Sequence, residues 1–121
     1  MEDHGITWKK EVSTLADMVQ YHTGSIVSRA LISKKTGIVT LFAFDGGQSL
    51  SEHTSPFDAM VNILDGVAEI TISGTSFKVS QGEAILMPAG EPHALSAPQP
   101  FKMMLVMIKS HTSKSDSHQC E

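Results

Sequence analysis

The segment Gly82–Leu95 reads GEAILMPAGEPHAL, and the interpretation of the whole chain starts from it. Its apolar run, Ala84–Met87, is typical of a short strand, and Pro88 ends that strand because proline has no backbone N–H for the ladder. Gly90 then permits a tight turn, since glycine adopts positive φ without steric cost. A new strand begins at His93, so the segment predicts a strand, a corner and a histidine that faces the interior.

Length and composition limit the class of protein. A chain of 121 residues fits one domain. With 40% hydrophobic and 18% charged residues, it has the composition of an ordinary globular protein. The net charge of −4 and the scattered basic residues argue against a nucleic acid or an anionic membrane as partner.

Targeting signals are not evident in the sequence. No apolar run approaches the roughly 20 residues of a membrane span, and the acidic start, MEDH, is unlike a secretory signal. The one cysteine, Cys120, excludes an internal disulfide framework and fits a reducing compartment. We therefore expect a cytoplasmic protein.

The chain divides into an N-terminal extension (1–24), a strand-rich region (25–109) and a polar tail (110–121). Apolar residues at helical spacing predict a short helix in the extension: Val12, Leu15, Ala16 and Val19. Ser13 or Thr14 is placed to cap it. The tail has no aliphatic residue and is expected to be mobile, and its His111 and His118 are interpreted as polar tail residues rather than metal ligands.

Turn signals recur about every 8–12 residues in the strand-rich region, which predicts an all-β sandwich or barrel. The expected strands are Ser25–Ser33, Gly37–Asp45, Ala59–Leu64, Val67–Ser73, Ser76–Ser80, Ala84–Met87 and Phe101–Lys109. The strand Gly37–Asp45 is apolar on both faces, which indicates cover on both sides, as in a sandwich or an oligomer interface.

The quoted segment resembles the second sequence motif of the cupin superfamily, in which a glycine, five residues, Pro-x-Gly and two further residues precede a histidine. Gly82, Pro88, Gly90 and His93 match every position. The resemblance covers roughly Gly37–Lys109 and is to small single-domain cupins of the RmlC-like, conserved-barrel type 2 kind. It implies an all-β jelly-roll barrel, also called a double-stranded β-helix.

The first cupin motif is matched only in part. Its flanking glycines correspond to Gly47 and Gly66. His53 fits the second histidine, whereas Ser51 stands where the first histidine would be. The acidic position falls on Asp58 when counted from His53, and on Ala59 when counted back from the second glycine.

The resemblance implies that His53 and His93 lie close together in the barrel, as part of a reduced site for a divalent metal (Fe, Mn, Ni or Zn). Divalent sites usually take at least three protein ligands. Asp58 is the candidate for a two-histidine, one-carboxylate set, and Gln48 is a candidate oxygen ligand. The alternative is that the two histidines form hydrogen bonds inside a metal-free pocket.

Strand alternation refines the ligand set. Alternate side chains point to opposite faces of a strand. We therefore expect Ser51 and His53 on one face and Glu52 on the other, which makes Glu52 a weak ligand candidate.

Three functions remain open because fold does not determine function. The first is a metal-dependent dioxygenase or isomerase, and the second is a non-catalytic module that binds or senses a small ligand without metal. The third is an interaction barrel with relic histidines. The methionine-rich strands suit a pocket for a small, mostly apolar organic molecule with one polar handle. We also expect a homodimer that packs through its sheets.

Overall fold

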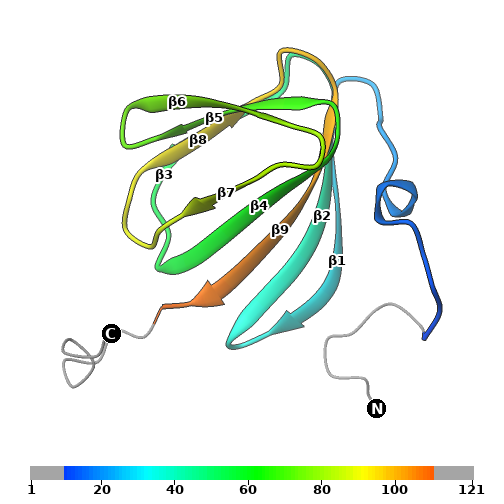
Figure 1. The fold of residues 1–121 in the computed structure, drawn as a ribbon, viewed down its shortest axis with the longest axis horizontal. Coiled ribbons are helices and arrows are strands. Elements are labelled where there is room, and N and C mark those ends of the chain that lie inside the picture. The colour runs from blue at the N-terminus through cyan, green and yellow to red at the C-terminus, as the bar shows by residue number, and fades with distance from the viewer. Residues whose placement is uncertain (1–9, 111–121) are drawn as a thin grey trace.

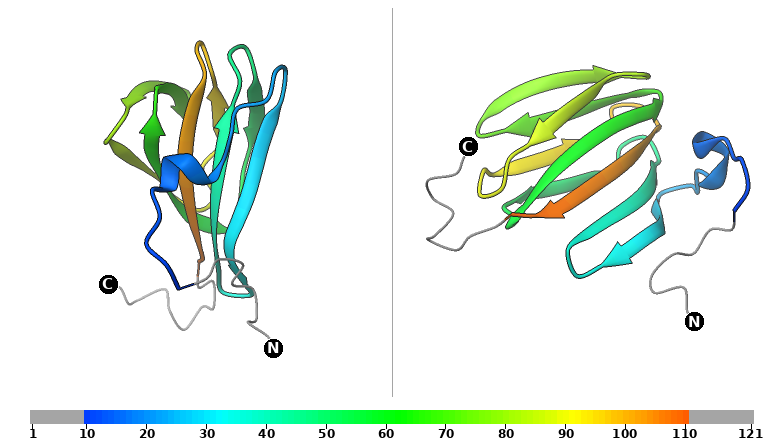
Figure 2. Two further views of the ribbon diagram at one scale, coloured as in Figure 1. Left: turned by 90° about the vertical axis from the view of Figure 1, so that its right-hand side faces the viewer. Right: turned by 60° about the horizontal axis from the view of Figure 1, so that its bottom comes forward.

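The computed structural model describes residues 10–110, which form two antiparallel sheets that face each other (Figures 1 and 2). The five-stranded sheet has the order β1-β2-β9-β4-β7, and the four-stranded sheet has the order β3-β8-β5-β6. The strands are β1 (Ile26–Lys34), β2 (Gly37–Phe44), β3 (Ser49–His53), β4 (Phe57–Asp65), β5 (Val67–Ile72), β6 (Thr75–Ser80), β7 (Ala84–Met87), β8 (His93–Ser96) and β9 (Phe101–Lys109). The expected jelly-roll architecture is confirmed. The expectations for His111, His118 and Cys120 lie outside the described residues.

The inner faces of the two sheets form the main core. Phe44 of β2 and Phe101 of β9 stack with ring centroids 4.5 Å apart and ring planes 14° apart. Alternate residues of β5 are buried against them, as the period-two pattern predicts: Ala68, Ile70 and Ile72. The core therefore binds the sheets together at the end where the β8–β9 loop crosses over.

The N-terminal extension forms less helix than its spacing predicts. Among residues 10–24 the regular element is η1 (Leu15–Met18), a four-residue 3-10 turn, and Thr14 makes no capping hydrogen bond with its side chain. A helix this short is not stable by itself. Its conformation depends on the sheet below, where Leu15 and Met18 pack beside Leu41 of β2. No helix among residues 10–110 is long and apolar enough to cross a membrane.

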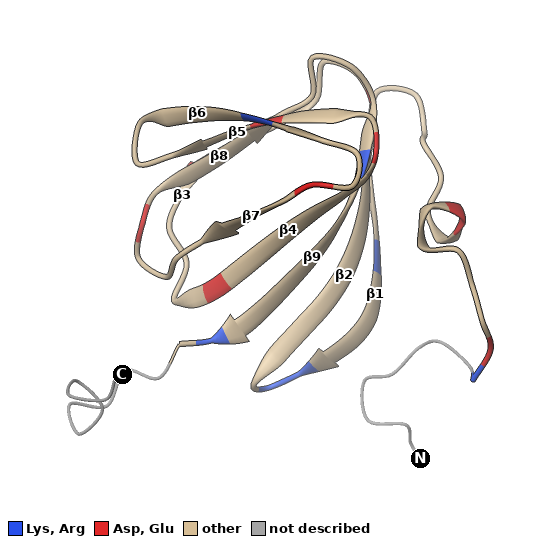
Figure 3. Ribbon diagram, viewed as in Figure 1, with Lys and Arg blue, Asp and Glu red and all other residues tan. Residues whose placement is uncertain are grey.

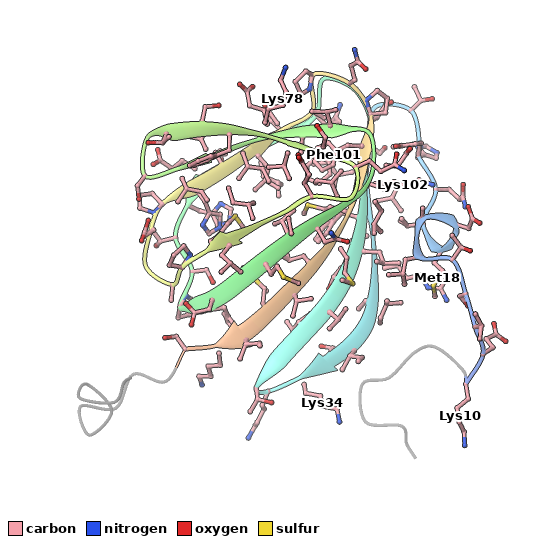
Figure 4. The ribbon with its side chains drawn as sticks, in the orientation of Figure 1. Lys10, Met18, Lys34, Lys78, Phe101 and Lys102 are labelled. Carbon is pink, nitrogen blue, oxygen red and sulfur yellow. The ribbon has the colours of Figure 1, made fainter. Side chains whose placement is uncertain are left out.

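A buried lysine holds this N-terminal segment against the sheet. Lys102 of β9 donates a hydrogen bond of 2.6 Å to the carbonyl of Ala16, and its Nζ lies 5.0 Å from the centroid of the Tyr21 ring (Figure 4). The Tyr21 hydroxyl donates a 2.5 Å hydrogen bond to Asp65. Burial, followed by this bond, raises the pKa of the phenol well above its usual range. The chain's own N-terminal segment thus covers part of the outer face of β2.

Gly66 packs closely against the β8–β9 loop. Its φ of 77° is a conformation that favours glycine, and a Cβ at this position would collide with the carbonyl oxygen of Pro100. Gly74 has a similar φ of 85°, but a Cβ there would meet no atom within 4 Å. Substitution of these two glycines therefore distinguishes the cost of backbone strain, which both share, from the cost of a steric collision, which only Gly66 would meet.

We expect Gly66→Ala to lower the free energy of unfolding by more than about 3 kcal/mol, because it adds a collision to the left-handed strain. Gly74→Ala carries the strain alone and should cost about 1 kcal/mol. Urea unfolding of both variants measures the difference. Equal losses in the two variants would contradict the close packing of the β4–β5 turn on the β8–β9 loop.

Candidate functional site

A cavity of about 260 Å³ lies between the two sheets, and its wall is mostly apolar. The polar side chains that line it are His53, Ser55 and His93. The rest of the wall consists of Phe42, Leu50, Phe57, Ala59, Leu95, Met103, Leu105 and Met107. The strand methionines Met103 and Met107 therefore face the interior, as the composition of β9 suggests.

A β-bulge in β3 brings the two histidines together. Leu50 pairs with Leu95, and His53 pairs with His93, so three residue steps on β3 match two steps on β8. Ser51 and Glu52 together oppose the single residue Ala94, which is the count of a bulge. The imidazole centroids are 4.4 Å apart, with the ring planes at 70°.

The bulge overturns the expected placement of Ser51. We expected it to share a face with His53, but Ser51 lines a groove on the outer face of the four-stranded sheet, together with Thr71 and Ser96. The prediction was wrong because strict alternation fails where an extra residue is inserted. The hydroxyl that stands in place of the first motif histidine does not line the cavity.

Both histidines present the same ring nitrogen as a hydrogen-bond acceptor. His53 donates its Nδ1–H to the carbonyl of Ser51 at 2.8 Å, and His93 donates its Nδ1–H to the carbonyl of Glu91 at 3.2 Å. A carbonyl can only accept, so each Nδ1 carries the proton, and in the neutral imidazole each Nε2 keeps its lone pair. In that form the pair offers two acceptors.

The environment of His93 favours this neutral form. Its side chain is buried, and desolvation lowers its pKa below the ordinary value of 6.5. The hydrogen bond to the Glu91 carbonyl raises the pKa of His93, and the electrostatic effect of the neighbouring His53 lowers it by a smaller amount.

Asp58 does not reach the histidines. It lies on β4 between Phe57 and Ala59, which both line the cavity, so its own side chain points outward and is exposed. Its Oδ1 accepts a 2.9 Å hydrogen bond from the backbone N–H of Ala89. Asp58 therefore supports the turn that precedes His93 from outside the barrel.

The inward position of β4 is taken by Ala59, which is buried and has no donor atom. Gln48, the other candidate ligand, precedes β3, at the end of the strand away from His53. Its backbone carbonyl accepts from Ala97. Five residues of strand span about 16 Å, so Gln48 lies far from the pair.

The donor set does not fit a resident divalent metal. His53 and His93 supply two nitrogens, and within residues 10–110 no three His, Cys, Asp or Glu side chains gather into a group that could hold an ion. Structural and catalytic sites usually have at least three protein ligands.

Several cavity residues were not identified from the sequence. Phe57 precedes the expected strand Ala59–Leu64, although it continues the alternation of Ala59 and Val61 by one step. Leu50 and Ser55 had no sequence signal, because their positions depend on the bulge and on the loop that follows β3.

Comparison with known proteins identifies the class. Residues 40–109 match the cupin domain family, and the chain belongs to that family. A conserved protein of unknown function from Streptococcus pyogenes is 39% identical, with a TM-score of 0.85, and the match covers 93% of this chain and 98% of that one. No protein of curated function matches the chain.

Two further solved structures are similar. A Cupin 2 conserved barrel domain protein from Leptotrichia buccalis is 39% identical, with a TM-score of 0.76, and the match covers 78% of this chain and 46% of that one. A cupin superfamily protein from Desulfitobacterium hafniense has a TM-score of 0.81 at 24% identity, over 88% of this chain and 96% of that one. The second similarity supports the fold alone.

A carboxylate added beside the two histidines tests whether a third donor atom is what the cavity lacks for binding a metal. We expect Ala59→Glu to place a carboxylate in the cavity with the two imidazoles and to increase zinc affinity at least tenfold, as measured by isothermal titration calorimetry. The double variant Ala59→Glu, His93→Ala should lose the gain. An Ala59→Glu protein that is folded but binds zinc no better than the wild type would contradict the assignment of Ala59 as the vacant ligand position.

Stability should depend on pH through His93. Its pKa is lowered on folding, so the unfolded chain binds the proton more readily. The free energy of unfolding should be highest above pH 6.5 and should fall as the pH drops through the lower, folded pKa. We expect His93→Gln to flatten this dependence in urea unfolding, whereas His22→Gln, at an exposed turn, should not. If the free energy of unfolding of His93→Gln depends on pH as steeply as that of the wild type, another group causes the loss of stability at low pH.

Proposed function

We propose that this cupin binds a small, mostly apolar organic molecule in the cavity between its sheets, without a resident metal. The observation that supports this most directly is the pair of imidazoles, His53 and His93, in a mostly apolar wall. Few, convergent polar groups in an apolar pocket are typical of small-molecule sites. The function is that of a binding or sensing module.

The size of the cavity limits the ligand. An apolar cavity of about 150 Å³ admits benzene. The 260 Å³ available here therefore suits a substituted ring or a branched chain of similar size. Met103 and Met107 can adapt to an irregular ligand because methionine is unbranched and has three rotatable bonds.

The polar handle of the ligand follows from the tautomers. Two Nε2 acceptors pair with a hydroxyl or an N–H donor, whereas a carboxylate would place its own acceptors against theirs. Burial lowers the pKa of His93, so the neutral, accepting form is present at neutral pH. We therefore favour a phenol, an alcohol or an amide-like ligand over an acid.

A metal-dependent dioxygenase or isomerase is the second candidate, because both Nε2 atoms are free to bind an ion. A metal held there would depend on donors that the described residues do not bring together. A cytoplasmic location is part of the proposal, and it rests on the single cysteine, which fits a reducing compartment.

The test compares 4-ethylphenol with ethylbenzene, which has the same apolar body without the hydroxyl. We expect the wild type to bind the phenol about fivefold more tightly by NMR titration, since one net hydrogen bond contributes about 1 kcal/mol. His53→Ala and His93→Ala should reduce this preference, while His22→Ala should retain it. Binding of neither compound, or equal affinity for both, would overturn the proposed polar anchor.

Metal content distinguishes the two candidates. Protein purified without chelator or affinity tag should contain far less than one equivalent of Fe, Mn, Ni or Zn. An equimolar metal that is lost in both His53→Ala and His93→Ala would overturn the metal-free proposal and favour the enzyme.

A further inference from the structure

Ser55 is the third polar residue of the cavity wall, and its surroundings hold it in one position. It follows β3 in the loop that leads to β4. Its carbonyl oxygen accepts a 2.9 Å hydrogen bond from the backbone N–H of Gly90, and its hydroxyl oxygen accepts a 3.0 Å bond from the backbone N–H of Phe57. Pro56, whose ring fixes φ, comes directly after it. The serine is therefore fixed through both its main chain and its side chain.

The hydroxyl proton of Ser55 is free for a ligand. A serine hydroxyl has one donor and two acceptor positions. The N–H of Phe57 occupies one acceptor position, and the O–H group has no acceptor among residues 10–110. Because Ser55 is two residues beyond His53, the two Cα atoms lie within about 7 Å of each other, and both side chains line the same cavity. The wall therefore offers one hydrogen-bond donor beside the two histidine acceptors.

The polar groups gather toward the mouth of the cavity, and its inner wall is apolar. His53 is exposed and Ser55 is half-buried. Leu95 and Met103, on the same wall, are only 3% and 1% exposed. A ligand that fills the cavity thus directs its apolar body inward and holds its polar handle at the mouth.

The residues that line the cavity also exclude a strong charge. None of those that the structure describes is Lys, Arg, Asp or Glu. Figure 3 shows charge at the start of β4 and at the end of β9, but neither Asp58 nor Lys109 lines the cavity. An uncharged handle fits this wall, because a buried charge needs a partner.

We propose that the handle of the ligand is a primary carboxamide and that Ser55 selects its carbonyl group, a specificity that rests on the function proposed above. A primary carboxamide has two N–H donors and one carbonyl acceptor. These complement the Nε2 atoms of His53 and His93, in their neutral forms, and the hydroxyl of Ser55. A phenol has one proton to donate and leaves one imidazole unpaired, which is costly in a partly buried site.

The test uses three probes of the same shape. Benzamide has both N–H donors and the carbonyl, acetophenone has the carbonyl alone, and isopropenylbenzene has neither. NMR titration of the full chain gives the affinity for each probe. Ratios of affinities for two probes are compared between variants, because differences in the hydration of the probes then cancel. A substitution that only loosens the loop weakens all three probes alike and leaves these ratios unchanged.

The preference for acetophenone over isopropenylbenzene reports on Ser55. We expect Ser55→Ala to reduce this ratio about fivefold, which corresponds to one net hydrogen bond, and Ser55→Thr, which retains the hydroxyl, to preserve it. Ser76→Ala is the matched control and should also preserve it, since Ser76 is an exposed residue of β6 that donates to Glu69 outside the cavity.

The preference for benzamide over acetophenone reports on the histidines. His53→Ala should reduce this second ratio about fivefold, whereas Ser55→Ala should leave it unchanged. Circular dichroism of each variant confirms that it is folded. If Ser55→Ala does not fold, Ser55→Cys replaces it, because a thiol is a weak donor.

Three results would overturn the carboxamide assignment: no binding of benzamide by the wild type, an unchanged first ratio in the folded Ser55 variant, or an equal reduction of that ratio in Ser76→Ala. The comparison of 4-ethylphenol with ethylbenzene separates this failure from failure of the proposed function. A protein that prefers the phenol but shows no effect of Ser55 keeps the histidine anchor and loses only the carboxamide. A protein without the phenol preference loses both.

Discussion

The register of β3 against β8 is the constraint on which the candidate site depends. An unbroken pairing that begins with Leu50 opposite Leu95 would set Glu52 opposite His93 and turn His53 outward. The bulge adds one residue to β3 and so exchanges these two side chains. The cavity therefore receives an imidazole in place of a carboxylate, and its polar end becomes a pair of hydrogen-bond acceptors.

The same backbone determines the chemistry of that pair. Each Nδ1–H is bound by a carbonyl located two residues before its own histidine, at Ser51 and at Glu91. The local chain thus sets the tautomer, and burial favours the neutral form of His93. Asp58 stabilises the preceding turn from outside, through Ala89, rather than contributing charge inside. The site combines an apolar wall with acceptors and no carboxylate.

The N-terminal segment divides the outer face of the five-stranded sheet. Lys102 and Tyr21 bind it over the end of the sheet near the β8–β9 loop, which gives an apolar strand such as β2 cover on both faces. The ammonium of Lys102 is buried, yet it retains a carbonyl acceptor and an aromatic face, which offset part of its desolvation. On the rest of that face, Leu86 and Ile108 are exposed.

Sequence alone determined most of the strands and, through the resemblance of its motifs, that His53 and His93 lie close together. β7 and β9 match the predicted bounds, because glycine and proline mark strand ends locally and period-two burial is visible in the residues themselves. His93 follows from the spacing around Gly90. Only the tertiary structure decided that a bulge turns His53 inward, that Ser51 and Asp58 face outward, and that Ala59 lines the cavity. These placements depend on which strand pairs with which and in what register, and a bulge changes register without leaving a residue-level signal.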